Sequence, residues 1–166
     1  MGWRTTAERG FTVAELLIVI VIIGILSILV MNTFGGSQAR ARDAVRSDDA
    51  HMLVGQLIAY STIHNGLPRP QSYSGADYGV YDTSAQGDWL PFLASSTTGK
   101  IPKDPLNNGV GDPMAASGQY TYFYTCFKHG VDPGAPSATN DVARIGYRVE
   151  HAGAVKTTDF NVEACQ

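Results

Sequence analysis

The chain has 166 residues, enough for one compact domain with an attached segment. Charged residues make up only 16% of the chain and the formal net charge is −3, so the composition lacks the broad basic surface that non-specific nucleic-acid binding requires. Apolar residues make up 44% but are concentrated near the N-terminus, whereas residues 65–143 are rich in Gly, Pro, Ser, Asp and Tyr. We therefore expect an apolar N-terminal segment, a polar globular part, and no direct binding of nucleic acid.

The apolar segment covers residues 11–34 and is 24 residues long. A helix of about 20 residues crosses the hydrocarbon core of a bilayer, so the segment is long enough to span one. It is too long for a cleaved secretory signal, and no small-residue cleavage site of the A-x-A type follows it. The sequence predicts a single transmembrane helix here.

Glu15 lies inside this apolar segment, near its start. Placing Arg, Lys or Asp at the centre of a membrane helix costs about 2.5–3.5 kcal/mol, so an ionisable residue in such a segment indicates a functional site with a partner. The alternative is a side chain that extends to the membrane interface near the helix end. The local sequence leaves both interpretations open.

The helix is expected to continue beyond the membrane, because no proline occurs between Phe11 and Pro68. A continuous helix from Phe11 to His64 would be about 80 Å long, with its weakest point at Gly35-Gly36 and its end at Asn65-Gly66. Residues 35–71 would form the amphipathic half and the following turn. Its predicted apolar stripe consists of Val45, Met52, Gln56, Ala59 and Ile63, with Leu53, Leu57 and Tyr60 alongside.

The stretch "RGFTVAELLIVIVIIGIL" resembles the N-terminus of type IV pilins and type II secretion pseudopilins, which carry a class III signal. The resemblance implies that a prepilin peptidase cuts between Gly10 and Phe11 and removes residues 1–10 as a leader. It implies that Phe11 is then N-methylated. It also gives Glu15 a partner, the Phe11 amine of a neighbouring subunit, and thus a role in assembly.

The same resemblance implies a structural subunit rather than an enzyme, and no catalytic motif is present in the sequence. The expected function is a type IV pilin that leaves the membrane to join a homo-oligomeric helical filament on the cell surface, for motility, adhesion or DNA uptake. The implied partners are minor pilins, the prepilin peptidase and an inner-membrane assembly platform. The alternatives are a type II secretion pseudopilin and, with less support, a membrane-anchored ligand-binding module.

Residues 72–166 are expected to form the globular head. Strict alternation predicts strands at residues 120–127 and 144–150, and a third strand runs from Val155 to Val162. A helical turn is expected at residues 89–93 and a long loop at 130–143. A long helix packed against a small antiparallel sheet is the α+β class, in a pilin-like arrangement.

Cys126 lies near the end of the first strand, and Cys165 is the penultimate residue. Two cysteines beyond a membrane segment favour a disulfide in an oxidising compartment, the alternative being two free buried thiols. A C-terminal disulfide is common in type IV pilins, whereas many pseudopilins lack one. This resemblance favours the pilin over the pseudopilin.

The stretch "IPKDPLNNGVGDP" resembles the proline-aspartate-proline loop at which major pseudopilins bind calcium. Its hard oxygen ligands would be Asp104, Asn107, Asn108 and Asp112. Asp-Pro and Asn-Gly pairs are also ordinary turn formers, so a plain turn is the alternative. No other cofactor is expected.

Overall fold

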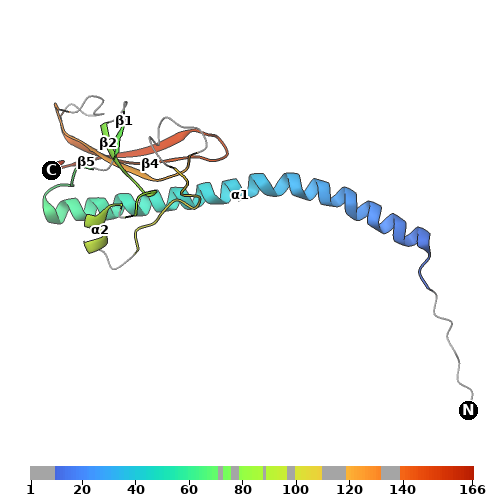
Figure 1. Cartoon of the computed structure of the whole chain (residues 1–166). Coiled ribbons are helices and arrows are strands. Elements are labelled where there is room, and N and C mark those ends of the chain that lie inside the picture. The colour runs from blue at the N-terminus through green and yellow to red at the C-terminus, as the bar shows by residue number, and fades with distance from the viewer. Residues whose placement is uncertain are drawn as a thin grey trace, which may run out of the picture. The chain divides into compact units, whose positions relative to one another are not determined.

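The structure is a computed structural model that describes residues 10–70, 73–75, 79–87, 89–96, 100–109, 119–131 and 139–166. Within these residues the elements, in chain order, are α1 (Val13–His64), β1 (Tyr73–Gly75), β2 (Gly79–Thr83), α2 (Pro91–Ser96), β3 (Phe123–Phe127), β4 (Asp141–Arg148) and β5 (Val155–Val162) (Figure 1). The long helix and antiparallel sheet confirm the α+β class. The chain divides into two compact units, which we call the stem unit (Met1–Gln38) and the head unit (Ala39–Gln166).

Helix α1 is 52 residues long and passes through Gly35 and Gly36 without a break, which confirms the continuous helix. It ends where Asn65 and Gly66 adopt positive φ angles of 60° and 147°. The Gly66 amide donates back to the Ser61 carbonyl at 3.1 Å. A Cβ on Gly66 would lie 2.5 Å from the carbonyl oxygen of Ala164, so both the φ angle and the close approach require glycine.

In the stem unit, α1 presents its apolar side chains outward. Every large apolar side chain from Val13 to Met31 is at least 49% exposed. By length and composition, α1 is apolar enough to cross a membrane, and it is the one such helix among the described residues. Exposed aliphatic surface of this extent is stable only against lipid or other protein chains.

The head unit contains a five-stranded antiparallel sheet in the order β1-β2-β3-β4-β5. The register places Tyr124 of β3 opposite Ile145 of β4, which in turn lies opposite Thr158 of β5. Sequence analysis predicted β5 with its observed bounds. It did not predict β1 and β2.

Two predicted strands have different bounds in the structure. β3 begins at Phe123 rather than Tyr120, because the preceding backbone bonds elsewhere: the Tyr120 carbonyl accepts from Asn108 N, and the Tyr122 carbonyl accepts from Ser84 N. β4 begins at Asp141, inside the predicted loop at 130–143. The helical turn expected at residues 89–93 is instead α2, which begins at Pro91, a favoured first position for a helix.

The core lies between one face of α1 and one face of the sheet. Helix α1 contributes Ala50, Leu53 and Leu57. The other side of the core is formed by Tyr122, which directly precedes β3, and by sheet residues that include Tyr124, Cys126, Ile145 and Tyr147. Leu53 and Leu57 have no exposed surface, and burying a leucine side chain stabilises a fold by about 1.5–3 kcal/mol. This packing of helix on sheet was predicted.

The buried face of α1 matches only part of the predicted stripe, which is a correction. Val45, Met52 and Ile63 are 48%, 44% and 77% exposed. The face that packs on the sheet is centred on Leu53 and Leu57, which the prediction had placed alongside the stripe. Its N-terminal end is occupied by Arg46, a buried charged residue that interrupts the apolar pattern of this face.

Candidate functional site

The N-terminal end of α1 carries the residues predicted for processing. Gly10 lies before the helix, and nothing lies within 4 Å of a Cβ built on it. Phe11 is 86% exposed. Among the described residues, nothing therefore blocks access to the peptide bond between Gly10 and Phe11. Cleavage and methylation at this bond stay predictions.

Glu15 has a partner inside its own chain that sequence analysis missed. Its carboxylate accepts hydrogen bonds from the amide and the hydroxyl of Thr12, each at 2.8 Å. The Glu15 amide in turn donates to the Thr12 hydroxyl at 3.3 Å. This reciprocal pair is a capping box, and the pattern Thr-x-x-Glu at the start of an apolar run could have revealed it. Glu15 therefore caps α1 whatever its role in assembly.

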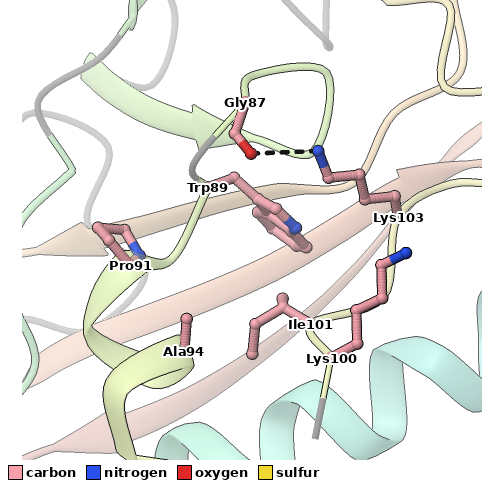
Figure 2. A pocket seen from close by; sticks show the side chains of 7 residues that line it. All are labelled: Gly87, Trp89, Pro91, Ala94, Lys100, Ile101 and Lys103. Carbon is pink, nitrogen blue, oxygen red and sulfur yellow. Dashed lines mark hydrogen bonds between the residues drawn. The ribbon is translucent and has the colours of Figure 1, made fainter.

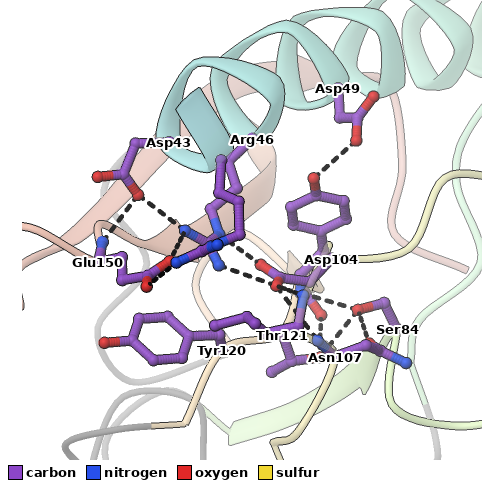
Figure 3. A network of polar contacts seen from close by, with 12 residues as sticks. Asp43, Arg46, Asp49, Ser84, Asp104, Asn107, Tyr120, Thr121 and Glu150 are labelled. Atoms are coloured by element: carbon purple, nitrogen blue, oxygen red, sulfur yellow. Dashed lines mark hydrogen bonds and ion pairs between the residues drawn. The ribbon is translucent and has the colours of Figure 1, made fainter. Parts of the chain in front are cut away.

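A second polar cluster joins α1 to the rest of the head unit around Arg46, whose side chain is completely buried (Figure 3). Its Nε and Nη2 atoms donate to the two carboxylate oxygens of Asp104 at 2.7 and 3.1 Å, the bidentate geometry that suits arginine. Its Nη1 atom donates to Asp43 at 2.8 Å and to Glu150 at 3.2 Å. Tyr120 lies against the guanidinium, with its ring centroid 4.9 Å from Cζ.

The turn after β4 completes this cluster. Asp43 accepts hydrogen bonds from the amides of Glu150 (2.7 Å) and His151 (3.2 Å), and from His151 Nδ1 at 2.6 Å. Arg42 Nε donates to Glu150 at 2.7 Å. We call these six residues, Arg42, Asp43, Arg46, Asp104, Glu150 and His151, the Arg46 network.

The Arg46 network shifts the ionisation of its carboxylates. Burial of Asp43 opposes its charge, but the hydrogen bonds from Glu150, His151 and Arg46 outweigh burial and lower the pKa to about 2. The hydrogen bond from Arg42 is the main cause that lowers the pKa of Glu150. Both carboxylates are thus held in their charged form at neutral pH.

Sequence analysis did not predict the Arg46 network, because most of its contacts join residues more than 50 positions apart. One signal was available. Arg46 lies four residues before Ala50 and seven before Leu53, on the helix face that forms the core. A charged residue in that position must either leave the core or find buried partners.

Asp104, one of the predicted calcium ligands, contacts other residues of the chain in the structure. Both of its oxygens bond to Arg46, and Oδ1 also accepts the amides of Leu106 and Asn107 at 2.9 and 3.3 Å, as in a turn stabilised by an aspartate side chain. Asn107 Oδ1 accepts from the Ser84 hydroxyl, and Asn108 Oδ1 from the Tyr120 amide. Asp104, Asn107 and Asn108 therefore take part in a hydrogen-bonded turn, and calcium binding stays a prediction.

Asp112, the fourth predicted calcium ligand, lies outside the described residues. Among the residues that the structure describes, no group of three or more His, Cys, Asp and Glu side chains could hold a metal ion.

The predicted disulfide is present between Cys126 and Cys165, with the two Cα atoms 5.7 Å apart. The C-terminal tail is also held by its backbone: Leu67 N donates to Ala164 O, and Gln166 N donates to Leu67 O, each at 2.8 Å. Asp141 Oδ2 accepts the Cys165 amide at 2.7 Å. The tail is thereby fixed both to the sheet and to the turn that ends α1.

Known proteins are similar to this chain both in its N-terminal segment and over most of its length. The family described as "Prokaryotic N-terminal methylation motif" matches residues 5–31. Type II secretion system core protein G of Pectobacterium carotovorum subsp. carotovorum is 28% identical over 141 residues, which cover 85% of this chain and 85% of that protein. A match of that length includes most of the head unit. These matches support the resemblance of the chain to the pilin and pseudopilin family.

Two further relatives carry the same name. Core protein G of Klebsiella pneumoniae is 27% identical over 135 residues, covering 81% of this chain and 92% of that protein. Core protein G of Aeromonas hydrophila is 28% identical over 113 residues, which cover 68% of this chain and 76% of that protein. No solved structure is significantly similar to this chain. Members of the pilin and pseudopilin family are structural subunits and not enzymes, in agreement with the sequence analysis.

Proposed function

We propose that this chain is a pseudopilin, the repeating subunit of a type II secretion fibre in the periplasm. The observation that carries the proposal is the similarity to core protein G over 76–92% of the relatives' lengths. The N-terminal motif that all class III signals share covers only residues 5–31 here, so it cannot account for matches of 113–141 residues. This proposal reverses the order of preference from the sequence analysis, which placed the type IV pilin first.

The proposed processing begins with cleavage between Gly10 and Phe11, followed by methylation of the new Phe11 amine. Before assembly, the Glu15 carboxylate is held by Thr12, so its position at the start of α1 is fixed. The amine of an incoming subunit would then meet a charge already in place. Attraction between opposite charges is much stronger at low dielectric than in water, so the pairing would favour the assembled state.

The proposed partners are further copies of the chain, minor subunits, a prepilin peptidase and an inner-membrane assembly platform. Before assembly the stem unit would anchor the protein in the membrane. Its exposed apolar surface would then exchange lipid for neighbouring stems in the fibre.

A type IV pilin is the second candidate, and one observation favours it. The Cys126–Cys165 disulfide ties the C-terminal tail to the sheet, an arrangement that the family resemblance associates with pilins. The two candidates predict different locations for the assembled fibre.

Deletion of the gene in its own host separates the two candidates. A pseudopilin predicts that secreted enzymes accumulate in the periplasm while surface fibres remain normal in number. A type IV pilin predicts the reverse: surface fibres disappear, this chain is found in the sheared fibre fraction of the wild type, and secretion continues. Re-expression of the full chain should restore whichever property was lost, and a Gly10 substitution that blocks processing should not.

A further inference from the structure

The outward face of α1 in the head unit forms an exposed strip. At 100° per residue, its members lie within an arc of about 80° on the side of the helix turned away from Leu53 and Leu57. All of them are exposed: Ala41, Val45, Asp48, Met52, Gly55, Ala59 and Ile63. We call them the outer strip. Single exposed apolar residues are normal, but a contiguous apolar row along a helix is typical of a protein interface.

Asp48 is the charged member of the outer strip, with Val45 one turn before it and Met52 one turn after it. It makes no hydrogen bond or ion pair with any described residue. The other two carboxylates of α1 in the head unit are both used internally, since Asp43 joins the Arg46 network and Asp49 accepts from the Tyr122 hydroxyl at 2.7 Å. Asp48 thus offers a charge flanked by apolar side chains.

The head unit also has a cavity of about 410 Å³ that is lined by apolar residues and by two lysines (Figure 2). Its apolar wall includes Trp89 and Ile101, which belong to the core cluster, and Pro91 and Ala94 of α2. In Figure 2, Lys100 and Lys103 lie across the cavity from α2.

The two lysines differ in how they are held. Lys103 Nζ donates to the carbonyl oxygens of Gln86 and Gly87, each at 3.2 Å, so its charge is fixed at the cavity. Lys100 is exposed and makes no hydrogen bond or ion pair within the described part of the chain. A carboxylate with apolar neighbours fits an apolar cavity with a cation at its edge, because the same contact buries apolar area and pairs charge.

We propose that Asp48, with Val45 and Met52, docks into this cavity, beside Lys100, on a second copy of this chain. The two surfaces are different parts of one molecule, so the contact is heterologous, and a heterologous contact that does not close on itself produces an open filament. The inference rests on the proposed function as a fibre subunit. It goes beyond that function by naming the contact between heads.

The test uses the full-length chain with its own assembly system and reverses each charge. Asp48→Lys and Lys100→Glu should each reduce assembled fibre about tenfold or more, because the like charges recur at every subunit contact. The double variant should recover fibre. The matched controls are Glu163→Lys and Lys156→Glu, which reverse exposed head charges outside the outer strip and the cavity and should leave fibre unchanged.

Cross-linking provides the direct readout. Cells that express Asp48→Cys copies together with Lys100→Cys copies should give a reducible dimer under mild oxidant, and replacing the first variant with Glu163→Cys should not. Normal fibre from both charge reversals, without the cross-link, overturns the contact while the proposed function stands. A wild-type chain that forms neither fibre nor cross-link overturns both. Each variant is first checked for the native disulfide, so that a misfolded head is recognised.

Discussion

In the stem unit, every large apolar side chain from Val13 to Met31 is at least 49% exposed, whereas in the head unit the same helix buries Leu53 and Leu57 completely. The head also has a disulfide and the Arg46 network. The comparison shows that one helix can depend on two sources of stability. The stem depends on lipid or neighbouring chains, and the head on its own core. Changes in the stem should therefore alter assembly, and changes in the head should alter the free energy of unfolding.

Glu15 in the stem unit and Arg46 in the head unit illustrate this difference. Glu15 is exposed and bonds only to Thr12, three residues away, among the described contacts. Arg46 is fully buried and bonds to partners as far away in sequence as Glu150. Glu15 is thus free to meet another subunit, while Arg46 has used its donors within the head.

The largest expected effect is on assembly and comes from Glu15→Gln. Glutamine can replace glutamate in a capping box, so the start of α1 should survive, but the charge that would pair with the Phe11 amine is lost. We expect a processed, membrane-resident subunit with few or no fibres, measured by immunoblot of membrane and fibre fractions. Glu15→Ala should behave in the same way.

Thr12→Ala is the matched control for this experiment, because it removes the capping hydroxyl and keeps the Glu15 charge. Near-normal fibre is expected, since loss of a cap costs only about 0.5–2 kcal/mol of helix stability. Fibre from the glutamine variant together with failure of Thr12→Ala would show that Glu15 acts as a cap and not as an assembly charge.

The largest effect on the stability of the head should come from Arg46→Ala. Removing the arginine leaves Asp104 buried without a counter-charge, and breaking a buried ion pair in this way costs about 3–5 kcal/mol. The measurement is near-UV circular dichroism of full-length protein in detergent during denaturant unfolding. Arg40→Ala, an exposed arginine on the same helix, should change the free energy of unfolding by about 0.5 kcal/mol or less. Equal effects from the two variants would mean that the network contributes nothing specific.

Loss of the disulfide should come next in size. The bridge closes a loop with a sequence separation of 39, for which the chain-entropy model gives about 4 kcal/mol as an upper figure. Cys126→Ser with Cys165→Ser should lower the denaturant midpoint of the head and leave the helical signal of the stem in place. Intact protein that reacts with two equivalents of an alkylating reagent, without reductant, would contradict the bond.

Sequence patterns predicted the parts of this fold that are governed by local order. The apolar run, the helix end at Asn65-Gly66 and the alternating strands depend on periodicity or on single backbone conformations. All three are present, with shifted bounds for the two alternating strands. The cysteine pairing followed from the positions of Cys126 and Cys165 on a strand end and the tail. These features need no knowledge of distant contacts.

The remaining features depend on long-range contacts or on weak local signals. Strands β1 and β2 have only 3 and 5 residues and contain glycine, so neither has a usable alternation. The predicted stripe of α1 combined residues of two faces. Leu53 and Leu57 pack on the sheet, whereas Val45, Met52, Ala59 and Ile63 are exposed on the outer strip. Hydropathy alone cannot tell a face buried in the molecule from one buried by a neighbour.

The smallest predicted effect concerns pH and Asp43. Its pKa is about 2 in the folded protein against an ordinary value of 3.8, so the folded state favours the charged form. A group whose pKa is lowered by folding contributes stability above its unfolded pKa, and that contribution disappears as the pH falls. Between about pH 4 and pH 2 the head should lose roughly 2 kcal/mol from this group, measured as unfolding free energy across an acid series. The lowered pKa of Glu150 adds a loss in the same direction.

Asp43→Asn and Asp48→Asn separate this contribution from general acid sensitivity. Both replace an aspartate of α1 by its neutral isostere, but Asp43 has a side chain only 10% exposed within the network, whereas Asp48 is exposed on the outer strip. Asp43→Asn should lower stability at neutral pH and flatten the acid limb of the profile, because no proton remains to be taken up at that position. Asp48→Asn should leave both unchanged in detergent, where no second head is docked. An acid limb that survives in Asp43→Asn at full size would assign the pH dependence to other carboxylates and remove Asp43 from the account.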